Sequence, residues 1–151
     1  MVAKKTTEDL FKILLVEDNP AHAELIMRSL GDHKVPNVIY HVKDGEVALD
    51  YLFQRGPYHN ISENPRPHVI LLDIRMPKVD GIQVLKEIKS SDTLKQIPVI
   101  ILTTSEAQRD VERAYKNYAN SYLVKPVDFD KFIQLMEDLG FYWLGWNHQL
   151  V

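Results

Sequence analysis

The sequence contains no cysteine and no long apolar run. Without cysteine the chain can form neither a disulfide nor a thiolate metal site, and such a composition fits a reducing, cytoplasmic setting. No stretch approaches the roughly 18 apolar residues that a membrane-spanning helix needs. Residues 1–10 carry lysines but no apolar core, so they do not resemble a secretory signal. We therefore expect a protein that neither crosses a membrane nor is secreted.

The chain also lacks an excess of positive charge. It has 18 Lys and Arg against 21 Asp and Glu, which gives a net charge of −3. The basic residues are scattered along the chain, which argues against nucleic acid as a partner. The six His show no spacing typical of a metal site. A length of 151 residues with 45% hydrophobic residues indicates a globular domain with one core.

Short apolar runs alternate with segments of helical periodicity. The runs that predict buried strands are 12–16, 37–42, 68–73, 98–103 and 119–124. A helix follows each of them, and the first has clear boundaries: Asn19 as N-cap, Pro20 at the first position and Gly31 at the end. Near-continuous apolar strands are covered on both faces. The pattern therefore predicts an α/β protein with a doubly wound parallel sheet.

Two later helices have predicted inward faces. Ser105 and Gln108 match a capping box that opens the fourth helix. Its predicted inward residues are Ala107, Val111, Ala114, Tyr115 and Tyr118. The last helix spans 128–139, and its predicted inward residues are Phe129, Phe132, Ile133 and Met136. The segment 54–67 is rich in Gly, Pro and Asn, which predicts a long loop of the kind that often has a function.

Polar side chains stand at the carboxyl ends of four predicted strands. Glu17 and Asp18 follow the first strand, and Asp73 ends the third. Thr103 ends the fourth, and Lys125 follows the fifth. Each of these residues alone has an ordinary explanation in helix capping or turn formation. A doubly wound sheet, however, binds its ligands outside the carboxyl ends of its strands, so we expect the five side chains to meet there.

This set of side chains favours phosphoryl transfer. Three carboxylates in one pocket raise at least one pKa unless cations neutralise them. Lys125 supplies one positive charge, and a divalent metal would supply the rest; oxygen ligands alone favour Mg²⁺ over Zn²⁺. An Asp carboxylate can be the nucleophile that accepts a phosphoryl group. The metal, Lys125, the Thr103 hydroxyl and backbone N–H groups after Asp73 would stabilise the charge on the transferred oxygens.

The motifs resemble the receiver domain of two-component response regulators. The matching segments are 16–19 (VEDN), 71–81 (LLDIRMPKVDG), 102–105 (LTTS) and 122–126 (YLVKP), and the resemblance covers about 11–139. It implies a flavodoxin-like (βα)5 sheet with strand order 2-1-3-4-5 and a histidine kinase that phosphorylates Asp73. It also implies that the protein is no enzyme beyond its own phosphotransfer and slow autodephosphorylation.

The resemblance implies a role for each acidic residue. Mg²⁺, with Mn²⁺ as a substitute, would bind Asp18, Asp73 and the backbone carbonyl of Arg75, with Glu17 contacting it through water. Glu17 stands where an aspartate is also common in the family, and it keeps the charge. Arg75 and Ser105 occupy the positions, two residues past Asp73 and Thr103, that tune phosphate lifetime.

A switch follows from the same resemblance. Thr103 would turn toward the phosphoryl oxygens, and the aromatic Tyr122 would move inward into the vacated space. The peptide bond before Pro126 would be cis and would aim Lys125 into the site. The surface around the fourth helix, fifth strand and fifth helix would then change shape.

Two features outside these motifs narrow the resemblance. The loop 54–67 and the aromatic segment 141–146 (FYWLGW) are similar to those of small stand-alone regulators that partner cyanobacterial phytochromes and related photoreceptor kinases. The expected division is an N-terminal extension, 1–10, a receiver domain, 11–140, and a C-terminal aromatic extension, 141–151. It leaves no residues for an output domain, so output would be protein contact or phosphorelay through a phosphotransfer protein.

The aromatic extension has two interpretations. Trp143 and Trp146 would expose apolar area at the end of the chain, which favours a homodimer or a partner surface. Packing of the same side chains back onto the last helix is the alternative.

Three other functions compete with the receiver hypothesis. An aspartyl-phosphate phosphatase needs an acid two residues after its nucleophile, where this chain has Arg75. A flavin carrier on the same fold needs a phosphate-binding loop after the first strand, where Glu17 and Asp18 would repel phosphate. A pseudo-receiver that binds partners without phosphorylation is disfavoured by the complete set of acidic, Thr and Lys residues.

Overall fold

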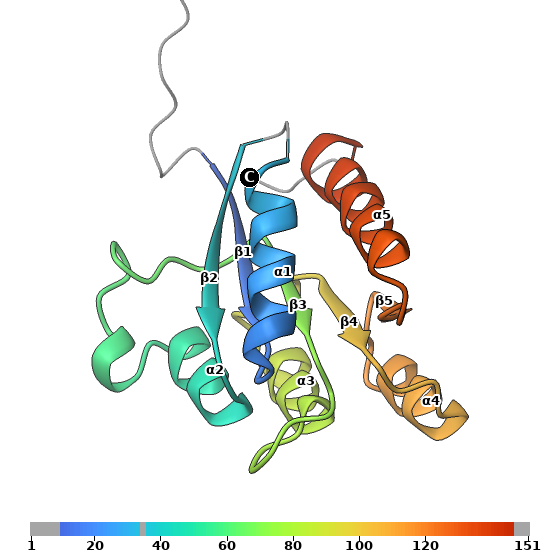
Figure 1. The fold of residues 1–151 in the computed structure, drawn as a ribbon. Helices are drawn as coiled ribbons and strands as arrows, with labels where there is room; N and C mark the ends of the chain where they lie inside the picture. The colour runs from blue at the N-terminus through green and yellow to red at the C-terminus, as the bar shows by residue number, and fades with distance from the viewer. Residues whose placement is uncertain (1–9, 34–35, 147–151) are drawn as a thin grey trace, which may run out of the picture.

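A single parallel sheet lies between two layers of helices (Figure 1). The computed structural model describes residues 10–33 and 36–146, and of residues 145 and 146 only the backbone. Residues 1–9 of the predicted N-terminal extension and 147–151 of the predicted aromatic extension thus lie outside the described residues. None of the described helices is both long enough and apolar enough to span a bilayer.

The sheet has the predicted flavodoxin-like order. Its strands are β1 (Phe11–Val16), β2 (Asn37–Val42), β3 (Val69–Leu72), β4 (Val99–Thr103) and β5 (Ser121–Val124). They lie in the order β2-β1-β3-β4-β5, and every pairing is parallel. The order reverses direction between β1 and β3, so the carboxyl ends of these two strands form the topological switch point where ligands bind.

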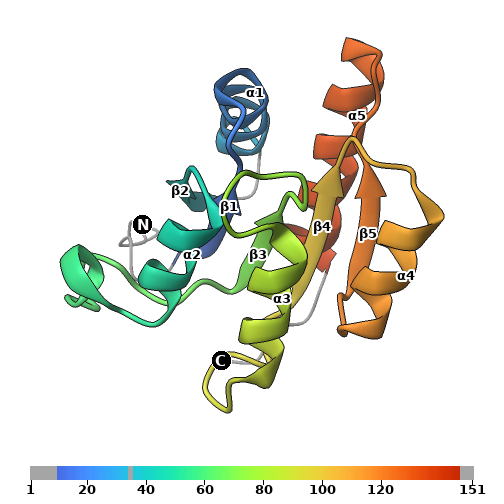
Figure 2. The same ribbon diagram turned by 90° about the horizontal axis from the view of Figure 1, so that it is seen from below.

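The helices divide the core into two halves. They are α1 (Pro20–Gly31), α2 (Gly45–Leu52), α3 (Gly81–Ser90), α4 (Gln108–Lys116) and α5 (Phe129–Gly140), with a short 3-10 turn, η2 (Gly56–Tyr58), in the predicted 54–67 loop. Helices α1 and α5 cover one face of the sheet, and α2, α3 and α4 cover the other (Figure 2). Alternate side chains of β1 serve the two halves: Ile13 and Leu15 pack with α1 and α5, and Leu14 and Val16 pack on the opposite face.

Side-chain caps begin four of the five α-helices in the described part of the chain. The Asn19 side chain accepts from the N–H groups of the first turn of α1, as predicted. Asp44, Asp80 and Asp128 do the same for α2, α3 and α5. Such caps satisfy backbone donors that would otherwise lack a partner at a helix start.

The start of α4 differs from the prediction. Its N-cap is Ala107, which has no side-chain cap, and the Ser105 hydroxyl bonds to Asp110 instead of to the backbone of Gln108. Among the predicted inward residues of α4, only Ala114 is fully buried. Tyr115 is exposed, and Tyr118 is 75% exposed and lies after the helix with a φ of 69°. The reason is that α4 packs beside the edge strand β5, so a single narrow stripe suffices to cover the core.

The last helix differs from the prediction at one residue, and it continues into the aromatic segment. Phe132 and Met136 are buried as predicted, but Phe129, in the first turn of α5, is 63% exposed. At the other end the aromatic residues continue the helix as a wider π-helical segment, η3 (Phe141–Trp146). Within it Leu144 is buried, and Trp143 packs against the α1–α5 half of the core. Part of the aromatic segment therefore packs inward, as the alternative interpretation expected.

Candidate functional site

The strand register brings the predicted site residues to one edge of the sheet. Val16 of β1 pairs with Leu72 of β3, so Glu17 and Asp73 are the next residues on neighbouring strands. The N–H of Asp73 donates to the carbonyl of Val16 at 3.1 Å, which continues this pairing. The arrows of β2, β3 and β4 in Figure 1 point toward this edge.

Lys125 arrives at the same edge by the same rule. Thr103 pairs with Val124 of β5, and the N–H of Lys125 donates to the carbonyl of Thr103 at 2.7 Å. The peptide bond before Pro126 is trans, since none of the described peptide bonds is cis. The cis bond that the family resemblance implied is therefore wrong. A trans bond is favoured by roughly 0.5–1 kcal/mol even before proline, and the long Lys125 side chain reaches the site without the cis turn.

Three carboxylates gather at the switch point. Glu17 and Asp73 are buried, whereas Asp18 is exposed. One oxygen of each carboxylate lies within 4.8 Å of an oxygen of the other two. All donors are oxygens, and the exposed Asp18 leaves one side of the cluster open to solvent. These properties match a hard divalent cation that keeps some of its water.

A buried lysine neutralises part of this negative charge. The Lys125 ammonium lies 3.0 Å from Asp73 Oδ2, and it also donates to Glu17 Oε1. A third contact, 3.0 Å to Nδ1 of His22 on α1, was not predicted from the sequence. Burial and the Lys125 charge lower the pKa of His22, and its Nδ1 is the acceptor in this contact because an ammonium group can only donate. The only signal for His22 in the sequence is its place one helical turn after Asp18.

Burial and the neighbouring charges shift the pKa of Glu17. Burial, and then the Asp73 charge, raise the pKa of Glu17 to about 7, against the opposing effect of the hydrogen bond and charge of Lys125. This confirms the expectation that at least one carboxylate of the cluster has a raised pKa. Lys125 brings one positive charge to a cluster of three acidic groups, which leaves room for a second cation.

The backbone after β3 holds Asp73 from the other side. The Arg75 N–H donates to Asp73 Oδ1 at 3.0 Å, so both oxygens of this carboxylate are engaged. The start of α3 presses directly on this turn at Gly81. A Cβ at Gly81 would lie 2.4 Å from the Asp73 carbonyl oxygen and 2.5 Å from the Ile74 Cα. Only glycine therefore allows α3 to begin this close to the carboxylate.

The two predicted switch residues are connected through Ser105. Thr103 is fully buried at the end of β4, and its Oγ1 accepts from the N–H of Ser105 at 3.3 Å. The half-buried Tyr122 donates its hydroxyl to the Ser105 carbonyl at 2.9 Å. The backbone of one loop residue thus links the threonine of β4 to the tyrosine of β5.

One further acidic residue beside the site, Asp110, was not predicted from the sequence. Asp110 of α4 is buried, and its Oδ2 accepts from the Arg75 guanidinium and from the Ser105 hydroxyl, each at 2.6 Å. The hydrogen bond from Ser105, followed by the charge of Arg75, lowers the pKa of Asp110 against the effect of burial. The Ser105 hydroxyl had been interpreted as a helix cap, which hid this contact.

A five-stranded doubly wound sheet with an acidic cluster and a buried lysine at its switch point defines a class: the receiver proteins of two-component signalling. A comparison with known protein families supports this class. The family described as "Response regulator receiver domain" matches residues 13–137, and the chain belongs to this family.

Known relatives are similar over nearly their whole length. The probable methanogenesis regulatory protein FilR2 of Methanothrix harundinacea is 49% identical over 140 residues, which is 93% of this chain and 88% of that protein. The structure of the phosphorylated cyanobacterial phytochrome response regulator RcpA matches with a TM-score of 0.89 and 39% identity, over 94% of this chain and 99% of that one. The Mn²⁺-bound form of response regulator Rcp1 matches with a TM-score of 0.87 and 35% identity, over 93% and 99%.

Proposed function

We propose that a histidine kinase phosphorylates this response regulator on Asp73 in a Mg²⁺-dependent reaction in the cytoplasm. The phosphorylated protein then signals through contacts with other proteins or passes the phosphoryl group on in a phosphorelay. The observation that carries this proposal is the buried Lys125 ammonium, 3.0 Å from Asp73 Oδ2, among the Glu17 and Asp18 carboxylates. The ammonium of Lys125 and the backbone N–H of Arg75 already contact the Asp73 carboxylate, so they can stabilise the negative charge that a phosphoryl group would add there.

The transfer makes one bond and breaks one bond. A carboxylate oxygen of Asp73 attacks phosphorus, and the bond between phosphorus and the donor's imidazole nitrogen breaks. The imidazole keeps the electron pair and takes up a proton from solvent. The Lys125 ammonium and the Arg75 N–H are in place to stabilise the charge on the phosphoryl oxygens.

Asp18, Asp73 and the Arg75 carbonyl are the groups that would hold the metal, with Glu17 acting through water. The oxygen-only donors within 4.8 Å of one another support Mg²⁺, with Mn²⁺ as a substitute. The Mn²⁺-bound structure of the similar Rcp1 also supports a divalent cation. When bound, the metal supplies positive charge against the cluster and against the phosphoryl group.

Thr103 and Tyr122 are proposed as the switch pair. Phosphorylation turns the Thr103 hydroxyl toward the phosphoryl oxygens, which takes it away from the Ser105 N–H that it accepts from in the structure. Tyr122, whose hydroxyl donates to the Ser105 carbonyl in the structure, then moves inward into the space that Thr103 vacates. The change reaches the surface formed by α4, β5 and α5.

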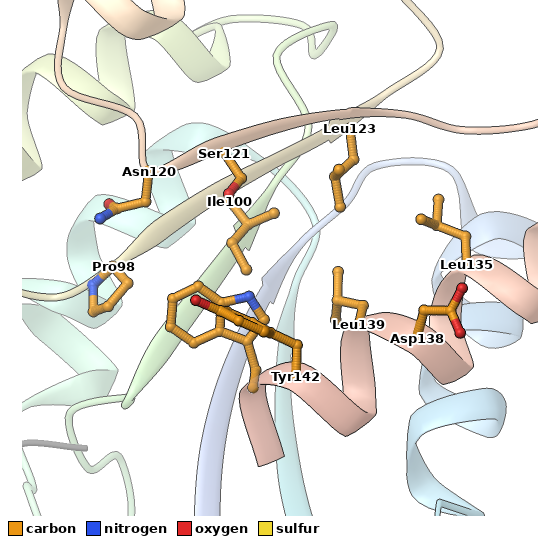
Figure 3. Close-up of a pocket in the computed structure, with 10 residues that line it drawn as sticks. Pro98, Ile100, Asn120, Ser121, Leu123, Leu135, Asp138, Leu139 and Tyr142 are labelled. Atoms are coloured by element: carbon orange, nitrogen blue, oxygen red, sulfur yellow. The ribbon is translucent and has the colours of Figure 1, made fainter. Parts of the chain in front are cut away.

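The proposed donor is a kinase of the phytochrome or photoreceptor type, because the chain is 39% identical to RcpA, a phytochrome response regulator. Homodimerisation through the end of α5 and through η3 is proposed with it. There the exposed Tyr142, which follows the exposed Phe141 in the chain, lines a groove of about 580 Å³ (Figure 3). Its apolar lining comes mainly from Pro98, Ile100, Leu123, Leu139, Tyr142 and Trp143.

Size measurement in solution tests the dimer separately from the chemistry. Tyr142, at 55% exposure, can be changed to Glu without disturbing the core, and Tyr118→Glu is the matched control on α4's side. The proposal expects a dimer in the wild type and a monomer for Tyr142→Glu alone. A wild type that stays monomeric at high concentration contradicts it.

Intact-protein mass after incubation with Mg²⁺ and acetyl phosphate tests the proposed phosphorylation. We expect one phosphoryl adduct in the wild type and in Asp92→Asn, an exposed surface control, but none in Asp73→Asn. Chelation of the metal should prevent the adduct. A wild type without an adduct would favour the pseudo-receiver alternative.

A further inference from the structure

Asp110 ties the first turn of α4 to two loops that border the acceptor site. Its Oδ2 accepts from Arg75 of the β3–α3 loop and from Ser105 of the β4–α4 loop, each at 2.6 Å. The carboxylate is buried, whereas the Arg75 side chain is 55% exposed. One oxygen atom of α4 therefore fixes two loop side chains at once.

Both of those loop residues are one hydrogen bond from the reacting groups. The Arg75 N–H donates to Asp73 Oδ1 at 3.0 Å. The Ser105 N–H donates to Thr103 Oγ1 at 3.3 Å, and the Ser105 carbonyl accepts from Tyr122. A change at Asp73 that moves either residue must strain or break a bond to Asp110.

A phosphoryl group on Asp73 would offer the Arg75 guanidinium a second anionic partner. This guanidinium is attached two residues from Asp73 and binds a carboxylate with one negative charge. A phosphoryl group brings up to two negative charges, and guanidinium groups suit phosphate oxygens well. The two anions therefore compete for one cation.

The surroundings allow Asp110 to release Arg75. The exposed Arg109 and Arg113 line the same pocket of about 300 Å³, together with Arg75 and the carboxylate of Asp80. Arg109 and the Ser105 hydroxyl both favour the ionised form of Asp110. The carboxylate thus keeps a charge partner and a hydrogen-bond donor after Arg75 has left.

We propose that Asp110 is a positioning residue that holds Arg75 and Ser105 in the unphosphorylated arrangement. Phosphorylation of Asp73 competes with Asp110 for the Arg75 guanidinium and loosens the first turn of α4. This inference rests on the proposed phosphorylation of Asp73. Because the Arg75–Asp110 contact belongs to one of the two states, it must oppose the other by the same free energy.

Titration with beryllofluoride, a phosphoryl mimic, in the presence of Mg²⁺ measures this opposition through backbone amide NMR signals. We expect Asp110→Asn to bind the mimic about five-fold more tightly than the wild type, at the lower end of typical coupling between sites. Glu112→Gln, an exposed residue of α4 with the same change of charge, should leave the affinity unchanged. In an Arg75→Gln background, Asp110→Asn should have no effect.

A merely structural role for Asp110 would lower the melting temperature without tightening binding. Unchanged or weaker affinity in Asp110→Asn therefore overturns the proposal. An equal gain in affinity from Asp110→Asn in the wild-type and Arg75→Gln backgrounds also overturns it. The wild type supplies an independent arm that needs no variant: amide hydrogen exchange at 110–111 should become faster when the mimic binds. Unchanged or slower exchange there also overturns it.

The outcomes separate this inference from the function on which it rests. A wild type that binds beryllofluoride and forms the acetyl phosphate adduct, but shows no effect of Asp110→Asn, removes the role of Asp110 and leaves the proposed function intact. A wild type that neither binds beryllofluoride nor forms the adduct contradicts both the role of Asp110 and the proposed function.

Discussion

The Lys125 ammonium lies 3.0 Å from Asp73 Oδ2, although the two residues are 52 positions apart in the chain. The contact exists because Asp73 follows β3 and Lys125 follows β5 in a parallel sheet whose strands end at one edge. The same ammonium binds Glu17, so a single cation holds two buried carboxylates together.

Loss of the lysine charge should destabilise the protein in a pH-dependent way. Lys125→Met leaves two buried carboxylates without their cation, and breaking a buried ion pair in this way costs about 3 kcal/mol. The cost should grow as pH rises above about 7, because Glu17 ionises there in the wild type, whereas loss of the hydrogen bond and charge of Lys125 raises the pKa of Glu17 in the variant. Urea unfolding at two pH values measures this. Lys116→Met, on the exposed side of α4, is the control, and equal stability of the two variants would contradict the prediction.

Added Mg²⁺ should stabilise the folded protein. A ligand that binds only the native state at a hundred-fold excess over its dissociation constant adds about 2.7 kcal/mol. Asp18→Asn should abolish most of this gain while leaving the metal-free protein almost unchanged, because Asp18 is exposed. Thermal unfolding with and without a chelator provides the measurement, with Asp130→Asn as the control. Equal gains in wild type and Asp18→Asn would show that the cation binds elsewhere.

The same substitution at two glycines should have opposite effects. Gly81→Ala places a methyl group 2.4 Å from the Asp73 carbonyl oxygen, and overpacking against backbone should cost about 2 kcal/mol. Gly31→Ala meets no atom within 4 Å at the end of α1 and should stabilise by about 0.5 kcal/mol. Denaturant unfolding of both variants measures these changes in the free energy of unfolding. If Gly81→Ala were as stable as the wild type, the close approach of α3 to Asp73 would be wrong.

His68 should make the protein less stable in mild acid. Its Nδ1 accepts from the Lys12 N–H at 2.9 Å, and burial, followed by the Lys12 charge, lowers its pKa from the usual 6.5. A lowered pKa in the folded state means that this stabilisation is fully present above pH 6.5 and declines as pH falls toward the lowered value. His68→Gln should flatten that part of the stability curve, and NMR titration of the ring gives the pKa directly. A ring pKa at or above 6.5 would contradict this assignment.

The sequence predicted the architecture because its signals are local and repeated. Each strand is a short apolar run, and the N-cap of α1 and its Pro20 mark that helix clearly. The site was predictable for a related reason: parallel strands carry their final polar residues to a common edge. Glu17, Asp73 and Lys125 needed no knowledge of side-chain packing to be placed together.

The features that sequence analysis missed depend on contacts between distant elements. His22 looks like any residue of an amphipathic helix until the Lys125 side chain, which follows β5 in the chain, reaches its ring. Asp110 has no sequence signal that distinguishes it from the other charged residues of α4. Tyr118 and Phe129 were placed inside because helical periodicity says nothing about where a helix stops or where the sheet edge leaves it exposed.

The chemical identity of the modified residue tests the proposed phosphorylation of Asp73 most directly. Wild-type protein is incubated with Mg²⁺ and acetyl phosphate and reduced with borohydride, which converts an aspartyl phosphate to homoserine, and the site is located by peptide mass. We expect homoserine at position 73 and at no other acidic residue, and we expect no homoserine when the metal is chelated. Homoserine at Asp18, the longer alcohol 2-amino-5-hydroxypentanoic acid at Glu17, or unmodified Asp73 under conditions where Mg²⁺ is bound, would contradict it.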